Sequence, residues 1–119
     1  MPANPIVIVT GSNGFIGHAV CNAFVKDDYA VVGFDRPDSG KPPDGITNIA
    51  CDVTSEQSVA DAVSRVLRDF EAPLASVIHL AAYYDFSGKP SPLYEKVTVQ
   101  GTERLLRLLK TAQPEQFVF

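Results

Sequence analysis

Three glycines spaced three residues apart are the first residues in this sequence whose spacing suggests chemistry. Gly11, Gly14 and Gly17 follow the apolar run 6–9 and enter a pattern of apolar residues with helical spacing. Glycines at such positions permit a tight turn, a close approach of backbone to phosphate, and close packing of a helix on a strand. The free N–H groups at the start of the helix would face the phosphate. The stretch 6–17 therefore predicts a pyrophosphate site. The residues expected to contact a bound dinucleotide here are Gly11, Asn13, Gly14, Phe15 and Ile16.

A carboxylate follows at the distance expected for recognition of a ribose. Asp35 comes directly after the apolar run 30–34 and stands close to the expected separation of about 20 residues from the last glycine of the turn. A carboxylate at this place suits the 2′-hydroxyl of NAD and repels the 2′-phosphate of NADP. The neighbouring Arg36 is a guanidinium that could pair with a 2′-phosphate instead. We expect NAD to be preferred, with NADP as the less favoured cofactor.

The ends of two further predicted strands supply the remaining site residues. Asp52 and Val53 follow the strand 46–51, where Asp52 either accepts a hydrogen bond from the adenine amino group or caps the next helix. Leu80, Ala81 and Ala82 lie at the end of the strand 75–80, where small residues let a flat ligand lie against the backbone.

A histidine beside this segment also carries a group capable of proton transfer. His79 lies inside the predicted strand, where an imidazole is more often a hydrogen-bonded packing residue than a catalytic one. We therefore leave His79 out of the candidate site.

The elements that must position these residues alternate between strand and helix. The predicted strands are 6–9, 30–34, 46–51 and 75–80, and a new apolar run begins at 117–119. The predicted helices are 15–26, the stretch after a capping box at 54–57, and 93–112. Residues expected on the core-facing stripes include Ile16, Ala23 and Leu67. This alternation predicts an α/β fold of Rossmann type, a doubly wound parallel sheet of order 3-2-1-4-5 that is truncated at strand five.

Composition narrows the classes of protein to which the chain can belong. Its 119 residues suffice for one domain, and ten basic against fourteen acidic residues give a net charge of −4. The absence of a basic run argues against nucleic acid as a partner, and no apolar run approaches membrane length. Cys21 and Cys51 have no His or Cys at ligand spacing, so we expect reduced, buried thiols in a cytoplasmic protein and no metal site.

Five segments in order resemble one known family. They are T-G-S-N-G-F-I-G at 10–17, Asp35, Asp52-Val53, H-L-A-A at 79–82 and V-T-V-Q-G-T-E-R-L-L at 97–106. These residues resemble the extended short-chain dehydrogenase/reductase family, the NAD-dependent epimerases and dehydratases. The resemblance implies a dinucleotide cofactor and, in most members, a nucleotide-sugar substrate. Thr98 stands where the family usually has an Asn that supports the active-site water and backbone geometry, and we count Thr98 among the candidate cofactor-site residues.

The catalytic residues implied by the resemblance do not occur in this sequence. The family places a Ser or Thr after the fifth strand and a Tyr-x-x-x-Lys pair later still. Here Tyr94 and Lys96 are two apart, which would point them to different sides of a helix. We therefore expect residues 1–119 to be the NAD-binding N-terminal portion of such an enzyme, without catalytic residues and without turnover. The alternative is a non-catalytic NAD(P)-binding sensor or interaction module.

The last segments of the chain also predict self-association. The run 117–119 would lie at an open sheet edge with two aromatic side chains, and unpaired strand edges favour pairing with another chain. The helix stripe containing Leu105, Leu108 and Leu109 is expected to lose part of its cover as well. We expect a homo-oligomer.

Overall fold

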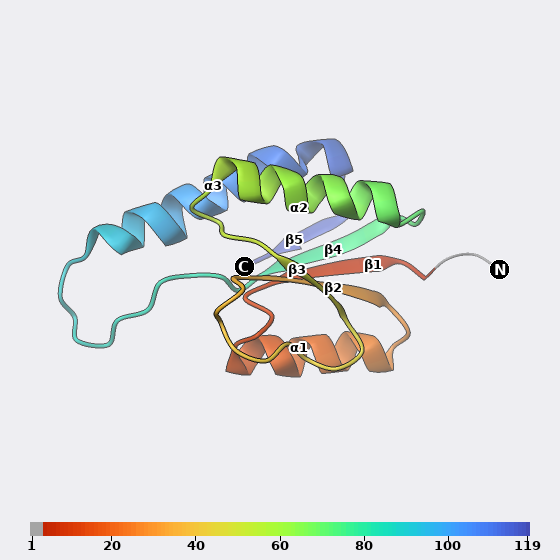
Figure 1. The fold of residues 1–119 in the computed structure, drawn as a ribbon, viewed down its shortest axis with the longest axis horizontal. Coiled ribbons are helices and arrows are strands. Elements are labelled where there is room, and N and C mark those ends of the chain that lie inside the picture. The colour runs from red at the N-terminus through yellow and green to blue at the C-terminus, as the bar shows by residue number, and fades with distance from the viewer. Residues whose placement is uncertain (1–3) are drawn as a thin grey trace.

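The computed structural model describes residues 4–119 and places them in three layers (Figure 1). A sheet of five parallel strands lies in the middle, in the order β3-β2-β1-β4-β5. Helix α1 covers one face of the sheet, and helices α2 and α3 lie side by side on the other face. The predicted doubly wound fold and its strand order are confirmed.

Each predicted strand agrees with the structure to within one residue at either end. The strands are β1 (Ile6–Thr10), β2 (Ala30–Asp35), β3 (Thr47–Ala50), β4 (Leu74–His79) and β5 (Gln116–Val118). The helices are α1 (Phe15–Lys26), α2 (Glu56–Asp69) and α3 (Gln100–Leu109). A π-helical segment (Tyr94–Val99) precedes α3, and a 3₁₀ turn (Lys110–Ala112) follows it.

The central strand β1 explains why both faces need helices. All five of its residues are buried, and successive side chains alternate between the faces. Ile6 and Ile8 belong to the core beneath α2 and α3, whereas Val7 and Val9 belong to the smaller core beneath α1. A run of consecutive apolar residues is therefore what a strand covered on both sides requires.

Helix α1 packs on the sheet through the predicted residues Gly17, Val20 and Phe24, but not through the whole predicted stripe. Its buried residues are Gly17 and Cys21, with Val20 partly buried against the same core. Ile16 and Ala23 are exposed, so the prediction that they pack on the sheet is wrong. Cys21 and Val25 take the places expected for Ile16 and Ala23, because the close contact of Gly17 with the turn fixes which side of α1 faces the sheet.

Helix α2 begins one residue later than predicted. Ser55 is the N-cap, and its hydroxyl accepts a hydrogen bond from the N–H of Ser58 at 3.1 Å. Thr54 does not cap the helix, because its hydroxyl and its N–H both donate to the carboxylate of Asp52. Leu67, predicted to face the core, is half exposed.

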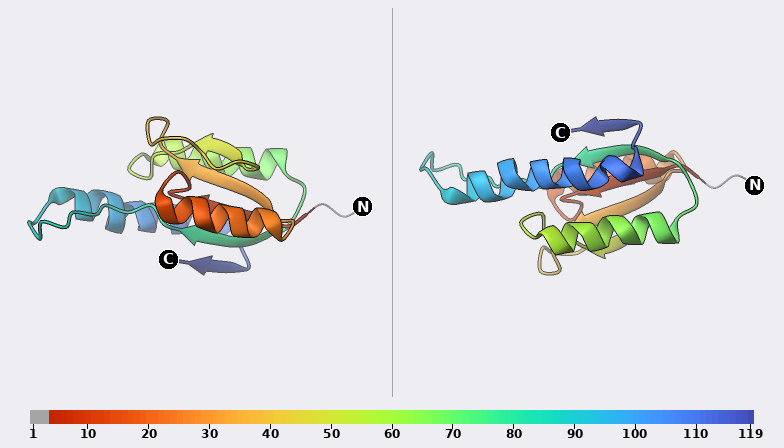
Figure 2. Two further views of the ribbon diagram at one scale, coloured as in Figure 1. Left: turned by 90° about the horizontal axis from the view of Figure 1, so that it is seen from below. Right: turned by 90° about the horizontal axis from the view of Figure 1, so that it is seen from above.

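The predicted helix 93–112 is divided in the structure into the π-helical segment, α3 and the 3₁₀ turn. Residues 83–99, which we call the arm, run out from the strand ends and return through the π-helical segment, and Figure 2 shows them extending beyond the layers. They lie at one end of the longest axis of the molecule (Figure 1), whose extents are 52, 27 and 23 Å. Helix α3 then buries Gly101, Leu105 and Leu109. In residues 4–119 we find no helix long and apolar enough to cross a membrane.

Candidate cofactor site

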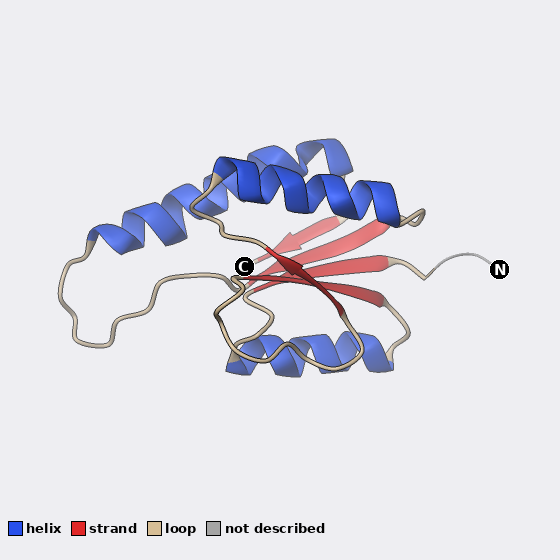
Figure 3. Ribbon diagram, in the orientation of Figure 1, coloured by secondary structure: helices blue, strands red, loops and turns tan. Residues whose placement is uncertain are grey.

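The segments that follow the carboxyl ends of β1, β2, β3 and β4 meet at one edge of the sheet (Figure 3) and enclose a cavity of about 640 Å³. The predicted site residues that line it are Gly11, Gly14, Phe15, Ile16, Asp35, Arg36, Asp52, Val53, Leu80, Ala81 and Ala82. Asn13 and Thr98 are not among the lining residues. Further lining residues include Ser39, Cys51, Thr54, Tyr83 and Tyr84. The cavity runs from the end of β3, past the glycine turn, to the segment after β4.

Two of the three glycines are required by the protein itself. Gly11 has a φ of +69°, and a Cβ there would lie 3.0 Å from the backbone nitrogen of Ala81. A Cβ on Gly17 would overlap the carbonyl oxygens of Gly11 and Ser12. These glycines let the turn lie directly against β4 and let α1 lie directly against the turn.

Gly14 has no such role within the chain. Its φ of −80° suits any residue, and a Cβ there would meet only the carbonyl oxygen of Gly11, at an ordinary 3.5 Å. Gly14 is also the N-cap of α1, and it provides no side-chain cap for the first helical N–H groups. Those groups are therefore left open toward the cavity edge, where an anion can accept their hydrogen bonds. The empty space at Gly14 and the uncapped helix together fit a pyrophosphate.

Asp35 connects the glycine turn to the end of β2. Its Oδ2 accepts a hydrogen bond from the N–H of Asn13 at 2.9 Å, and its Oδ1 accepts one from the N–H of Arg36 at 2.8 Å. Each carboxylate oxygen has a second lone-pair position, so both can still accept a hydrogen bond from a ribose hydroxyl. This positioning role was missed at the sequence level, since no spacing rule predicts a backbone partner.

The side chain of Asn13 holds the loop between β2 and β3. Its amide donates to the hydroxyl of Ser39 at 3.0 Å and to the carbonyl oxygen of Gly40 at 3.3 Å. His18 on α1 contacts the carbonyl oxygen of Lys41 at 2.8 Å. The loop is thus tied to the glycine turn and to α1, and Ser39 forms part of the cavity wall.

Asp52 is not the cap of α2, because Ser55 has that role. The Oδ1 atom of Asp52 accepts hydrogen bonds from the N–H of Thr54 at 2.9 Å and from the Thr54 hydroxyl at 2.7 Å. These bonds keep the pKa of Asp52 below its ordinary value, so the carboxylate is charged at neutral pH. Across residues 4–119 no hydrogen bond uses its Oδ2. Asp52 and Val53 line the cavity together, so Oδ2 is available to a ligand amino group.

His79 is a hydrogen-bonded packing residue, as predicted. The hydroxyl oxygen of Thr10 accepts bonds from the N–H groups of Leu80 at 3.0 Å and Ala81 at 3.1 Å. With both acceptor positions used, this hydroxyl must donate to Nδ1 of His79, 2.6 Å away. The Nε2–H of His79 then donates to the hydroxyl of Thr102 at 2.8 Å. The bonding pattern therefore fixes a neutral imidazole with its proton on Nε2.

This buried chain continues to Thr98. The Thr102 hydroxyl donates to the carbonyl oxygen of Thr98, and the Thr98 hydroxyl accepts a bond from the N–H of Tyr83 at 3.0 Å. Thr98 thus connects the π-helical segment to the segment that follows β4. It supports the cavity wall from behind rather than lining it.

Protonation of His79 should therefore destabilise the fold. Burial lowers the pKa of His79 below its ordinary 6.5, so the unfolded chain binds the proton more readily than the folded one. The contribution of neutral His79 to the free energy of unfolding is therefore fully present above pH 6.5 and is lost as the pH falls below that value. We expect the free energy of unfolding, measured in urea between about pH 7.5 and about pH 5, to fall more steeply in the wild type than in His79→Gln. Equal slopes would contradict the neutral tautomer.

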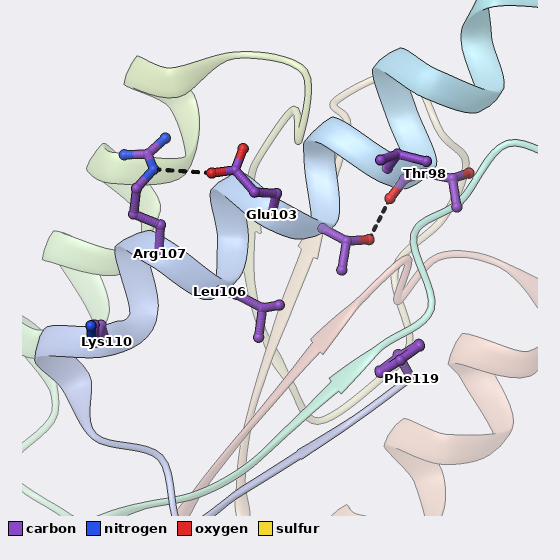
Figure 4. Close-up of a pocket in the computed structure, with 8 residues that line it drawn as sticks. Thr98, Glu103, Leu106, Arg107, Lys110 and Phe119 are labelled. Carbon is purple, nitrogen blue, oxygen red and sulfur yellow. Dashed lines mark hydrogen bonds and ion pairs between the residues drawn. The ribbon is translucent and has the colours of Figure 1, made fainter.

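A second hollow, of about 650 Å³, lies between α3 and the end of the chain (Figure 4). Its lining residues are Thr98, Val99, Thr102, Glu103, Leu106, Arg107, Lys110 and Phe119. The glycine turn does not border it, and α3 continues there directly from the π-helical segment. Arg107 pairs with Glu103 at 3.6 Å across the exposed side of α3. This hollow lacks the groups that hold a dinucleotide.

The fold and the cavity define a dinucleotide-binding domain of Rossmann type. The sequence profile of the NAD-dependent epimerase/dehydratase family matches residues 7–119, and the chain belongs to that family.

Three relatives illustrate the similarity. The sterol-4-alpha-carboxylate 3-dehydrogenase (decarboxylating) of Candida albicans is 30% identical over 123 residues, which cover 95% of this chain and 33% of that protein. UDP-glucose 4-epimerase of Thermus thermophilus, solved with NAD, has a TM-score of 0.79 at 27% identity, over 96% of this chain and 36% of that one. MoeE5, solved with UDP-glucuronic acid and NAD, has a TM-score of 0.69 at 28% identity, over 93% of this chain and 34% of that one. The chain thus spans about a third of the length of these relatives.

Proposed function

We propose that this chain binds NAD in the cavity at the strand ends and is the cofactor-binding portion of an NAD-dependent oxidoreductase of the epimerase/dehydratase type. The observation that carries the proposal concerns Gly14. No contact within residues 4–119 requires a glycine at this position, and Gly14 stands at an uncapped helix start facing the cavity. The pyrophosphate would lie at Gly14, Phe15 and Ile16, and the adenosine ribose at Asp35. The adenine would lie between Asp52, Val53 and the loop containing Arg36.

The opposite end of the cavity would take the nicotinamide, which accepts or returns a hydride when bound. Ala81 and Ala82 offer little side-chain bulk there, and Tyr83 and Tyr84 line the cavity beyond them. Thr98 would act from behind, by fixing the backbone of Tyr83. Asn13 would hold the loop over the adenosine end in place.

The preference for NAD over NADP is the first test of the ribose contact. Both oxygens of Asp35 are held by backbone N–H groups, one in the glycine turn and one on Arg36, so a 2′-phosphate would face a fixed negative charge. We expect calorimetric titration to give at least about tenfold tighter binding of NAD than of NADP. Asp35→Asn should reduce this preference. Equal affinities in the wild type would mean that Arg36 accommodates the 2′-phosphate.

Hydride transfer needs an acid or base that residues 1–119 do not contain in the family's form. No Tyr is followed four positions later by Lys in this sequence. In our proposal another part of the protein supplies the proton-transfer group, and the chain alone binds cofactor without turnover. If the protein is instead a non-catalytic binding module, the complete protein should also lack the Tyr-x-x-x-Lys pair.

A nucleotide sugar is the proposed substrate of the whole protein. The support is similarity to UDP-glucose 4-epimerase and to a protein solved with UDP-glucuronic acid, each at more than 25% identity. The similarity to a sterol dehydrogenase makes sterols the competing class of substrate. The free, buried thiols of Cys21 and Cys51 support a reducing, cytoplasmic location.

Self-association is proposed through the second hollow. Within the described sheet β5 pairs only with β4, and the hollow beside it carries Val99, Leu106 and Phe119, which are 54%, 46% and 89% exposed. The sequence predicted that the apolar stripe of α3 containing Leu105 and Leu109 would be partly uncovered. That prediction is wrong, because both side chains are fully buried within this chain alone. Light scattering should therefore show a dimer or larger species. Leu106→Glu should shift it toward monomer, whereas Leu67→Glu on α2 should not; a monomeric wild type would contradict the proposal.

A further inference from the structure

The loop that would hold the adenine is fastened from outside the cavity, by a side chain of α3. The guanidinium of Arg104 donates from Nη1 to the carbonyl oxygen of Val53 at 2.6 Å. Its Nε pairs with Oε1 of Glu56, in the first turn of α2, at 3.3 Å. The side chain of Arg104 is only 18% exposed, so it lies between the two helices and not in solvent.

One peptide group links this contact to the cavity. The carbonyl of Val53 and the N–H of Thr54 belong to the same planar peptide unit. Arg104 holds the carbonyl end of that unit, and the N–H end donates to Oδ1 of Asp52. Rotation of this peptide would break both bonds at once and would leave the Asp52 carboxylate held by the Thr54 hydroxyl alone.

The backbone of α3 restrains the same loop from a second direction. A Cβ on Gly101 would lie 2.9 Å from Cγ2 of Val53 and 3.4 Å from its carbonyl oxygen. Glycine at this place therefore lets α3 come into direct contact with Val53. Gly101 and Arg104 lie three residues apart on one side of the helix, and both contact Val53.

We propose that Arg104 is a positioning residue for adenine recognition, which it achieves by fixing the Val53–Thr54 peptide and through it the Asp52 carboxylate. The inference rests on the proposed function, because it presumes that NAD binds with its adenine at Asp52. An adenine amino group donates to Asp52, whereas hypoxanthine presents a carbonyl oxygen at the same position and is repelled. Loss of the Arg104 contact should therefore weaken the choice between the two bases.

The neighbouring Arg107 provides a matched control. Arg107 also pairs with Glu56, at 2.6 Å and 2.9 Å, but it makes no contact with Val53 among the hydrogen bonds of residues 4–119. Removal of Arg107 takes away the same charge and a comparable salt bridge from the same pair of helices. Of the two arginines, only Arg104 donates a hydrogen bond to Val53 within residues 4–119.

The test is to titrate NAD and nicotinamide hypoxanthine dinucleotide into the wild type, Arg104→Met, Arg107→Met and Arg104→Lys. We expect the wild type and Arg107→Met to prefer NAD by about tenfold, Arg104→Met to lose most of that preference, and Arg104→Lys to regain part of it. Thermal melts confirm that each variant is folded, and a purely structural role for Arg104 would lower the melting temperature without changing the preference.

The failures of the two proposals are distinguishable. A wild type that binds neither dinucleotide would overturn the proposed function, and the inference with it. If the wild type prefers NAD and folded Arg104→Met keeps the full preference, the positioning role alone is wrong.

Discussion

Replacing Gly14 with valine is expected to abolish NAD binding while the fold remains intact. The backbone at Gly14 is extended and the space around it is open, so a β-branched side chain fits the protein without strain. The same side chain would occupy the place proposed for the pyrophosphate and would shield the first N–H groups of α1. We expect the affinity for NAD to fall by at least about a hundredfold, with the unfolding free energy within about 1 kcal/mol of the wild type. Calorimetry and urea unfolding measure the two quantities separately.

The two results carry different information about Gly14. Unchanged NAD binding in the valine variant would place the phosphate elsewhere. A large loss of stability would mean that the protein itself needs the glycine, and the argument from its open surroundings would be wrong. Gly14→Ala is the graded control, since a single methyl group should weaken binding less than valine does.

The opposite outcome is expected at Gly17, only three residues away. Helix propensity alone predicts that Gly17→Ala stabilises the helix by about 1 kcal/mol. The structure predicts destabilisation, because the new Cβ would overlap the carbonyl oxygens of Gly11 and Ser12, which are backbone atoms and cannot rotate away. We expect a fall in melting temperature of more than about 5 °C, larger than any effect of Gly14→Val. A melting temperature equal to or above that of the wild type would contradict the packing of α1 on the turn.

The sequence predicted the fold closely because local pattern and global order agree in this chain. Strands β1, β2 and β4 are short, largely apolar runs that are mostly buried, and this pattern has few other interpretations. The site residues at the strand ends could be predicted for the same reason, since parallel strands bring their carboxyl ends to one edge. Asp35, Asp52 and the segment 80–82 all line the cavity as the pattern indicated.

The details that failed depend on contacts distant in the sequence. Ile16 was expected in the core, but its direction is set by the contact of Gly17 with a turn that only the folded chain forms. Thr54 fits a capping pattern, yet Asp52 competes successfully for its hydroxyl. The bond from the N–H of Asn13 to Asp35 and the contact of Arg104 with Val53 join residues 22 and 51 positions apart, and neither has a local signature.

The same contacts explain how a small domain can hold an extended ligand site. Each segment of the cavity wall is fixed by a residue outside it. Asn13 holds the loop after β2, Arg104 holds the loop after β3, and the Thr10–His79 pair holds the segment after β4. Because these bonds lie within the protein and do not involve a ligand, they would lower the ordering cost of binding.

The most direct test of NAD binding in the cavity at the strand ends is calorimetric titration of NAD into the chain, followed by competition with ADP-ribose. ADP-ribose keeps the adenine, both riboses and the pyrophosphate, which are the parts assigned here to Asp52, Asp35 and Gly14. We expect saturable binding of one NAD per chain that ADP-ribose displaces, with most of the affinity retained by ADP-ribose. No measurable binding of NAD to the folded chain, or NAD binding that ADP-ribose fails to displace, would contradict it.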